Sequence, residues 1–159
     1  AVDKPFRVGW PGFLITASLG HSMRVAFVSM HTHHTRDTYV NRRLSTLAGR
    51  LSEMGHEVTV LCGRWWDGSH PTFEQDGITY RVVDGSYSSR LFVSKLPFVL
   101  RKTKPDVVHV PNSPVGHGRA AKAACKLLRI PLVVDWWSDQ KRDSANDYRK
   151  LARSADTLI

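Results

Sequence analysis

Residues 23–62 read MRVAFVSMHTHHTRDTYVNRRLSTLAGRLSEMGHEVTVLC, and this stretch decides the fold. Its first part, Arg24–Ser29, is a short apolar run of the kind that forms a buried parallel strand. From Thr38 onward the apolar residues recur every three or four positions, which gives a helix one apolar face. Gly55 is suited to end that helix, and Glu57–Cys62 is a second apolar run. The stretch therefore predicts a strand, a helix and a second strand in succession.

The same alternation continues along the rest of the sequence. Further short apolar runs predict strands at Ile78–Val83, Asp106–Val110, Pro131–Asp135 and Ala155–Ile159. Helical patterns cover Arg90–Lys102, Val115–Arg129 and Ser144–Arg153. Gly63–Gly77 is predicted to be a loop, Ile78–Val83 an edge strand, and the helix that contains Pro97 to be kinked or broken. Alternating strands and helices predict an α/β, Rossmann-like fold with a mainly parallel sheet and helices on both faces.

Composition sets the size and the charge of the molecule. The 159 residues fit one domain, and a hydrophobic content of 42% is enough for a core. No run approaches the roughly 20 apolar residues of a membrane helix. Lys and Arg total 23 against 14 Asp and Glu, so the formal net charge is +9. This charge favours an anionic partner: nucleic acid, anionic lipid or a phosphate-bearing substrate.

The two ends of the sequence differ in texture. The first 22 residues show no regular period, so we expect residues 1–22 to be an extension of uncertain structure and residues 23–159 to be the domain. Cys62 lies in an apolar strand pattern and Cys125 in an Ala-rich helix pattern. Two buried thiols in a reducing compartment are therefore a better interpretation than a disulfide.

Several segments, in order, resemble the N-terminal domain of group-4-type glycosyltransferases. They are MRVAFVS from Met23, LAGRLSEMGHEVTVLCGR (Leu47–Arg64), PDVVHVPNSP (Pro105–Pro114), IPLVVD (Ile130–Asp135) and SADTLI (Ser154–Ile159). The resemblance implies a GT-B fold, in which two Rossmann-like domains face each other across a cleft. This chain would be the acceptor-side half, and the C-terminal donor domain would be absent.

The resemblance also implies an activity. The family usually transfers a sugar from a nucleotide-sugar donor to a glycan or lipid-linked acceptor, with retention and without a metal. We therefore expect a hexosyltransferase-type enzyme of polysaccharide biosynthesis with no cofactor, whose present fragment is inactive alone. In place of the Gly-rich loop that the family often has after its first strand, Met30–Thr35 contains no glycine.

Loops that follow predicted strands hold the candidate binding residues, because ligands of such sheets bind beyond the carboxyl ends of the strands. His31, His33 and His34 would hydrogen-bond a sugar or, when protonated, bind phosphate. A metal site is the weaker interpretation, because no Cys or carboxylate cluster stands beside them. Arg36 is placed for phosphate, while Arg42 and Arg43 fit a solvated helix face equally well.

The other candidate residues combine aromatic rings with polar groups. Arg64 and Trp65 leave the second strand together, and a Trp ring can stack on a sugar or simply pack beneath a loop. Asn112 and Ser113 follow the fourth predicted strand and are placed to hydrogen-bond a ligand. Asp135 and Trp136 end the fifth; Asp135 would bind an acceptor hydroxyl or act as the catalytic base.

Two alternatives to this assignment remain open. Arg90–Lys102 is apolar and basic, so it fits an anionic membrane surface as well as an ordinary crossover helix. A cytoplasmic protein that is peripheral at the inner face of the membrane would follow from the first interpretation. The alternative function is a non-catalytic nucleotide- or nucleic-acid-binding module, although no nucleic-acid motif is visible and nucleic acid is not the expected partner. A dinucleotide oxidoreductase is disfavoured because no G-x-G-x-x-G follows the first strand.

Overall fold

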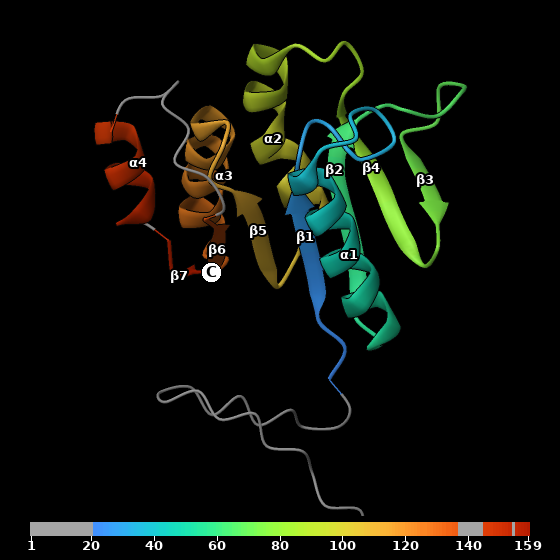
Figure 1. Cartoon of the computed structure of the whole chain (residues 1–159), viewed down its shortest axis with the longest axis horizontal. Coiled ribbons are helices and arrows are strands. Elements are labelled where there is room, and N and C mark those ends of the chain that lie inside the picture. The colour runs from blue at the N-terminus through green and yellow to red at the C-terminus, as the bar shows by residue number, and fades with distance from the viewer. Residues whose placement is uncertain (1–20, 137–144, 154) are drawn as a thin grey trace, which may run out of the picture.

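The computed structural model describes residues 21–136, 145–153 and 155–159 (Figure 1). The elements run in the order β1 (Arg24–Val28), α1 (Tyr39–Glu53), β2 (Glu57–Gly63), β3 (Thr72–Gln75), β4 (Ile78–Asp84), α2 (Ser89–Thr103), β5 (Val107–Pro111), α3 (Val115–Leu128), β6 (Leu132–Asp135), α4 (Ala145–Ala152) and β7 (Thr157–Leu158). Each element that the sequence predicts from residue 23 onward is present, with small shifts of its ends.

The strands form one sheet in the order β3-β4-β2-β1-β5-β6-β7. Every neighbouring pair is parallel except β3 and β4. From β4 to β7 this is the order of a doubly wound nucleotide-binding sheet, in which the chain starts at the centre and builds outward in both directions. The predicted Rossmann-like α/β fold is therefore confirmed. The direction of winding reverses between β1 and β5.

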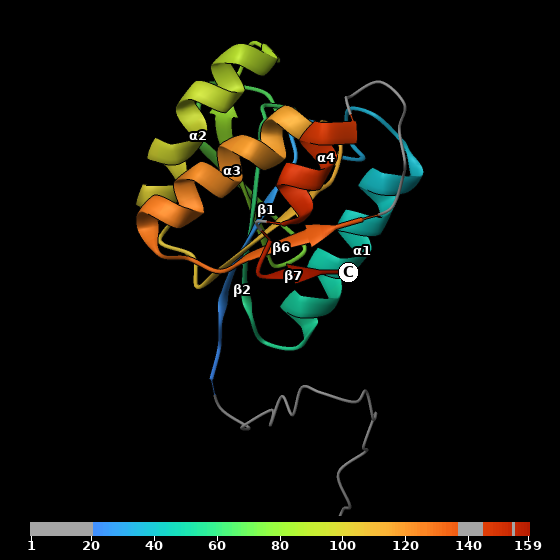
Figure 2. The same cartoon turned by 90° about the vertical axis from the view of Figure 1, so that its left-hand side faces the viewer.

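Helices cover the two faces of the sheet unequally. Figure 2 shows α1 on one face and α2, α3 and α4 on the other. Successive strand residues alternate between these faces, so Val25 and Phe27 join the core beneath α1, whereas Ala26 and Val28 join the larger core beneath α2 and α3. Burial on both sides explains why the strands have continuous apolar runs.

A hairpin corrects the prediction for residues 63–77. β3 pairs antiparallel with β4 and occupies the edge of the sheet, so β4 is not an edge strand. Gln75 pairs with Ile78 across a two-residue turn, and both turn residues, Asp76 and Gly77, have positive φ. Asp-Gly favours such a turn because both residue types tolerate this conformation. The hairpin signal was thus present in the sequence but not recognised.

The helix with the internal proline is also unbroken. α2 runs through Pro97 for 15 residues, between the N-cap Ser88 and the C-cap Lys104. Phe92, Leu96 and Leu100 are fully buried at four-residue spacing, so packing on the sheet offsets the hydrogen bond that Pro97 removes. The sequence predicted a kink or a break at Pro97, and the prediction of a break was wrong.

Two further predictions concern the N-terminal extension and the lack of a membrane-spanning helix. Residues 1–20 of the predicted extension lie outside the described residues. Among the residues that are described, no helix is both long and apolar enough to cross a membrane.

Candidate functional site

A pocket opens where the sheet reverses its direction of winding. Because β1 leads to one side and β5 to the other, the loops that follow them separate and leave a crevice at the carboxyl edge. The pocket there has a volume of about 440 Å³. Its lining comes from the loop after β1, the first turn of α1, the loop after β5 and the start of α3, and includes Ser29, His31, Arg36, Tyr39, Ser113 and His117. We call this the switch-point pocket.

Positive electrostatic potential is built into this pocket. The N-termini of α1 and α3 both reach it, and neither helix has an acidic residue in its first turn. The N-terminus of a helix carries a partial positive charge, which attracts anions. Thr38 caps α1 by accepting from the Asn41 N–H, but Pro114 gives α3 no side-chain cap. The exposed Arg36 adds a full positive charge, so the pocket suits phosphate or carboxylate groups.

The loop after β1 is ordered without glycine. The N–H groups of Thr35 and Arg36 both donate to the carbonyl of Thr32, which closes a tight turn. The buried Asn41 side chain donates to the Arg36 carbonyl at 2.7 Å. Side-chain amides that satisfy loop carbonyls fix a loop as well as backbone pairs do. These bonds hold Arg36 at the mouth of the pocket.

His31 is positioned by Tyr87, which lies in the loop after β4. The rings of His31 and Tyr87 stack at 5.2 Å, and the Tyr87 hydroxyl donates to the carbonyl of Arg64 at 2.6 Å. A Cβ on Gly63 would lie 2.5 Å from the Tyr87 ring, so glycine is required for this approach. Burial, followed by the charge of Arg36, lowers the pKa of His31, which favours the neutral imidazole as a hydrogen-bond donor or acceptor.

His117 was not singled out by the sequence. It is buried in the first turn of α3, and its Nε2 lies 3.1 Å from the Ser89 hydroxyl. Burial lowers its pKa to about 4, with a smaller contribution from His31. His117 is therefore neutral in the wall of the pocket near pH 7. The available signal was its position three residues after Pro114, the proline that precedes α3.

A second group of predicted residues lies outside the pocket. The rings of His34 and Trp65 stack at 3.7 Å and are nearly parallel, and His33 contacts His34 at the same centroid distance. Trp65 also meets Phe73 and Tyr80 edge to face. One face of the Trp65 ring is therefore already occupied. These rings join the loop after β1 to the loop after β2.

Arg64 orders its own loop. Its guanidinium donates to the carbonyls of Gly68 at 3.0 Å and Ser69 at 3.4 Å. The neighbouring Trp66 indole donates to the carbonyl of His70. Arg64 and Trp65 are thus placed together, as the sequence predicts, but they do not line the switch-point pocket.

A third group surrounds the end of β6. The buried carboxylate of Asp135 receives two hydrogen bonds from Arg43, at 2.9 and 3.4 Å, and lies 3.8 Å from Nε2 of His109. Burial lowers the pKa of His109 to about 4, although the nearby Asp135 carboxylate opposes this shift. Among the described residues, neither ring nitrogen of His109 has a hydrogen-bond partner. Of the two α1 arginines left open above, Arg43 thus has a structural role.

The remaining predicted residues lie beside these groups. Asn112 is fully buried, and its N–H donates to the carbonyl of Asp135 at 2.9 Å. Ser113 lines the pocket. Trp136 is half-buried and meets Tyr148 at 5.5 Å between ring centroids. Within the described parts of the chain, no cluster of three or more His, Cys, Asp or Glu side chains suits a metal ion.

Comparisons with known proteins give this geometry a context. A family model described as a glycosyl transferase 4-like domain matches residues 40–159. The structure of a sucrose-phosphate synthase from Thermosynechococcus elongatus has a TM-score of 0.65 at 12% identity. That match covers 86% of this chain and 42% of the synthase chain, and at this identity it shows the fold alone.

A second solved structure is less similar. The N-terminal domain of the nisin resistance regulator NsrR, a lantibiotic response regulator, has a TM-score of 0.44 at 16% identity. The match covers 87% of this chain and 85% of that domain, but its score is too low to support any argument. No curated protein matches the chain.

Proposed function

We infer a function from the premise that this chain belongs to the glycosyl transferase 4-like domain family and is a GT-B glycosyltransferase domain. We propose that it is the acceptor-side domain of a hexosyltransferase-type enzyme. The enzyme moves a sugar from a nucleotide-sugar donor to a glycan or lipid-linked acceptor in polysaccharide biosynthesis, with retention at the anomeric carbon. Sugar donors and acceptors are therefore its substrates, and no separate cofactor is proposed.

The switch-point pocket is the single observation that carries this proposal. It lies at the carboxyl edge, where α/β sheets bind their ligands, and it combines Arg36 with two helix N-termini. Phosphate groups of a donor or of a phosphate-bearing acceptor fit that potential. Neutral His31 and the hydroxyl of Ser113 supply hydrogen bonds suited to sugar hydroxyls.

The other predicted residues take supporting roles in the proposal. Asp135 is the candidate catalytic carboxylate, and its engagement by Arg43 favours contact with an acceptor hydroxyl over proton abstraction. Asn112 and Trp136 flank it at the same edge of the sheet. His33, His34, Arg64 and Trp65 would shape the acceptor side through the stacked loops.

Transfer needs a second surface to hold the donor. The chain spans 42% of the synthase that it resembles, and GT-B sites lie between two domains. We therefore propose that residues 23–159 are inactive without a donor domain that faces the pocket. For location, we propose a cytoplasmic protein attached peripherally to the inner face of the membrane.

Calorimetric titration with a panel of nucleotide sugars and sugar phosphates tests the proposal. Arg36→Ala should weaken binding about tenfold, because a charge-assisted bond to phosphate is lost. Arg42→Ala is the matched control, since Arg42 pairs with Asp37 away from the pocket and should leave affinity unchanged. Equal losses in both variants, or no binding of any phosphate-bearing sugar, would contradict the assignment.

A further inference from the structure

The layer formed by α2 and α3 has an outer surface that combines apolar and basic side chains. The two helices pack against each other on one face of the sheet (Figure 2). Their inward sides are buried, so their outward sides share one side of the molecule. Exposed there are Leu91, Phe98, Leu127, Arg101, Lys102 and Lys126, which we call the α2–α3 outer face.

The apolar residues on this face are unusually open to solvent. Phe98 is 70% exposed and Leu127 is 80% exposed. Leu91 precedes Phe98 by seven residues, or two helical turns, so both lie along one stripe of α2. Single exposed apolar residues are common and need no explanation. What needs an explanation is that these apolar residues lie among basic residues on two adjacent helices.

α2 and α3 differ from the other described helices in having no acidic residue. Neither α2 nor α3 contains Asp or Glu, and each ends at a basic C-cap, Lys104 or Arg129. By contrast α1 contains Glu53 and α4 contains Asp147. Acids of neighbouring elements pair with one cation of each helix, Asp84 with Lys95 and Asp147 with Arg119. The α2–α3 outer face itself carries Arg101, Lys102 and Lys126 and receives no acidic residue from its own helices.

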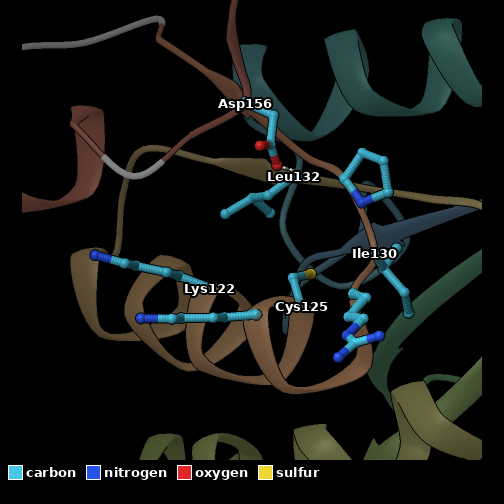
Figure 3. A pocket seen from close by; sticks show the side chains of 8 residues that line it. Lys122, Cys125, Ile130, Leu132 and Asp156 are labelled. Carbon is cyan, nitrogen blue, oxygen red and sulfur yellow. Dashed lines mark hydrogen bonds between the residues drawn. The ribbon is translucent and has the colours of Figure 1, made fainter.

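A basic groove extends this face along α3. The groove, with a volume of about 520 Å³, lies between α3 and the start of β6, and Lys122, Lys126 and Arg129 line it above an apolar floor. Figure 3 shows the Lys122 ammonium pointing away from Asp156, the acid in the lining. The carboxylate of Asp156 instead accepts from the Leu132 N–H at 2.8 Å.

We propose that the α2–α3 outer face docks on an anionic membrane surface. Phe98 and Leu127 insert among the headgroups, while the surrounding lysines and arginines contact lipid phosphates. Nucleic acid would satisfy the charge but would leave the exposed apolar side chains without a role. The inference deepens the membrane attachment included in the proposed function and does not depend on sugar transfer.

Helices α2 and α3 link the switch-point pocket to the opposite edge of the sheet. Pro114 and His117, at the N-terminal end of α3, line the switch-point pocket, and α2 begins beside His117 through Ser89. Of the docking face, Leu91 lies toward the pocket end, whereas Phe98, Arg101, Lys102, Lys126 and Leu127 lie in the C-terminal halves of the two helices, toward the amino edge of the sheet.

Co-sedimentation of the 159-residue chain with vesicles tests the proposal. We expect binding to phosphatidylcholine vesicles that contain phosphatidylglycerol, and at least tenfold weaker binding to phosphatidylcholine alone. Phe98→Ser should lower the partition coefficient roughly tenfold through lost apolar burial. Replacing Lys102 and Lys126 with Gln should lower it on the order of fivefold per residue, an effect that added salt removes.

Matched controls lie on the opposite helix layer. Met54, the C-cap residue of α1, is 71% exposed, and Met54→Ser should leave vesicle binding unchanged, as should Arg50→Gln. Leu127→Ser provides a second apolar variant if Phe98→Ser lowers the melting temperature. Equal effects of the α1 and α2–α3 variants overturn the proposal. So does binding to DNA with the same salt dependence and no dependence on Phe98. Loss of vesicle binding with intact sugar-phosphate binding rejects docking and leaves the proposed transferase untouched.

Discussion

At the scale of single residues, the histidines of the site divide by burial. His117 and His109 are buried, and burial lowers the pKa of each to about 4. The imidazole pKa in an unfolded chain is about 6.5. Below that pH the unfolded state therefore binds more protons than the folded state. Folding stability must fall as pH drops from about 6.5 toward 4.

His117→Gln tests this linkage. For the wild-type chain, His117 alone should cost about 2 kcal/mol of stability between pH 7 and pH 5. Glutamine cannot be protonated and retains a polar atom for Ser89, so the variant should lose less stability over the same range. Urea unfolding at both pH values measures the difference. His70→Gln, at an exposed position, is the control and should follow the wild type. An unchanged pH dependence in His117→Gln would show that this histidine does not carry the effect.

The positions of the predicted binding residues show which loops the sequence can place together, while their binding roles stay predictions. His31, Arg36 and Ser113 were predicted as cleft residues and line the pocket, because strand ends in a parallel sheet fix which loops meet. His34 and Trp65 follow the same rule, but they stack on each other outside the pocket. The direction of a loop side chain depends on its tertiary neighbours, and no sequence period encodes that.

At the scale of elements, one ion pair joins α1 to β6. Arg43 lies on α1 and Asp135 at the end of β6, and the two residues are 92 positions apart in sequence. Residues so distant meet only because β1 and β5 stand at the centre of the sheet. The sequence predicted both elements but not this contact, since periodicity locates a helix face without naming its partner.

Arg43→Gln should remove the ion pair that joins α1 to the end of β6. Loss of the guanidinium leaves the buried Asp135 carboxylate without its ion-pair partner, at a cost of about 2 kcal/mol. The pKa of His109 should rise, because Arg43 lowers it and Asp135 raises it. An NMR titration of the His109 ring measures the second effect and chemical denaturation the first. Arg42→Gln should change neither quantity appreciably. A His109 pKa that stays constant or falls in Arg43→Gln would refute the electrostatic coupling.

The elements themselves were predictable to different degrees. Parallel strands buried on both faces give apolar runs that are easy to recognise, as at β1 and β2. β3 has only one half-buried residue in a four-residue strand, so burial leaves almost no pattern there. Its best signal was the Asp76-Gly77 turn. Pro97 favoured a break that α2 does not have, because tertiary packing outweighs the local preference of proline.

At the scale of the whole molecule, two regions of positive potential compete for an anion. One is the switch-point pocket at the carboxyl edge, and the other is the groove along α3. The net charge of +9 alone does not distinguish them. Geometry distinguishes the two regions, because the pocket combines helix N-termini with an arginine and neutral hydrogen-bonding groups, and the groove does not.

An NMR titration of the isotopically labelled chain with pyrophosphate tests whether the switch-point pocket is the phosphate-binding site. We expect the backbone amides of Arg36 and Gly116 to shift first and with a common dissociation constant, while those of Lys122 and Lys126 shift only at higher concentration. The reverse order, with the α3 groove saturating while the amides of the pocket remain unchanged, would contradict the assignment of the switch-point pocket as the substrate site.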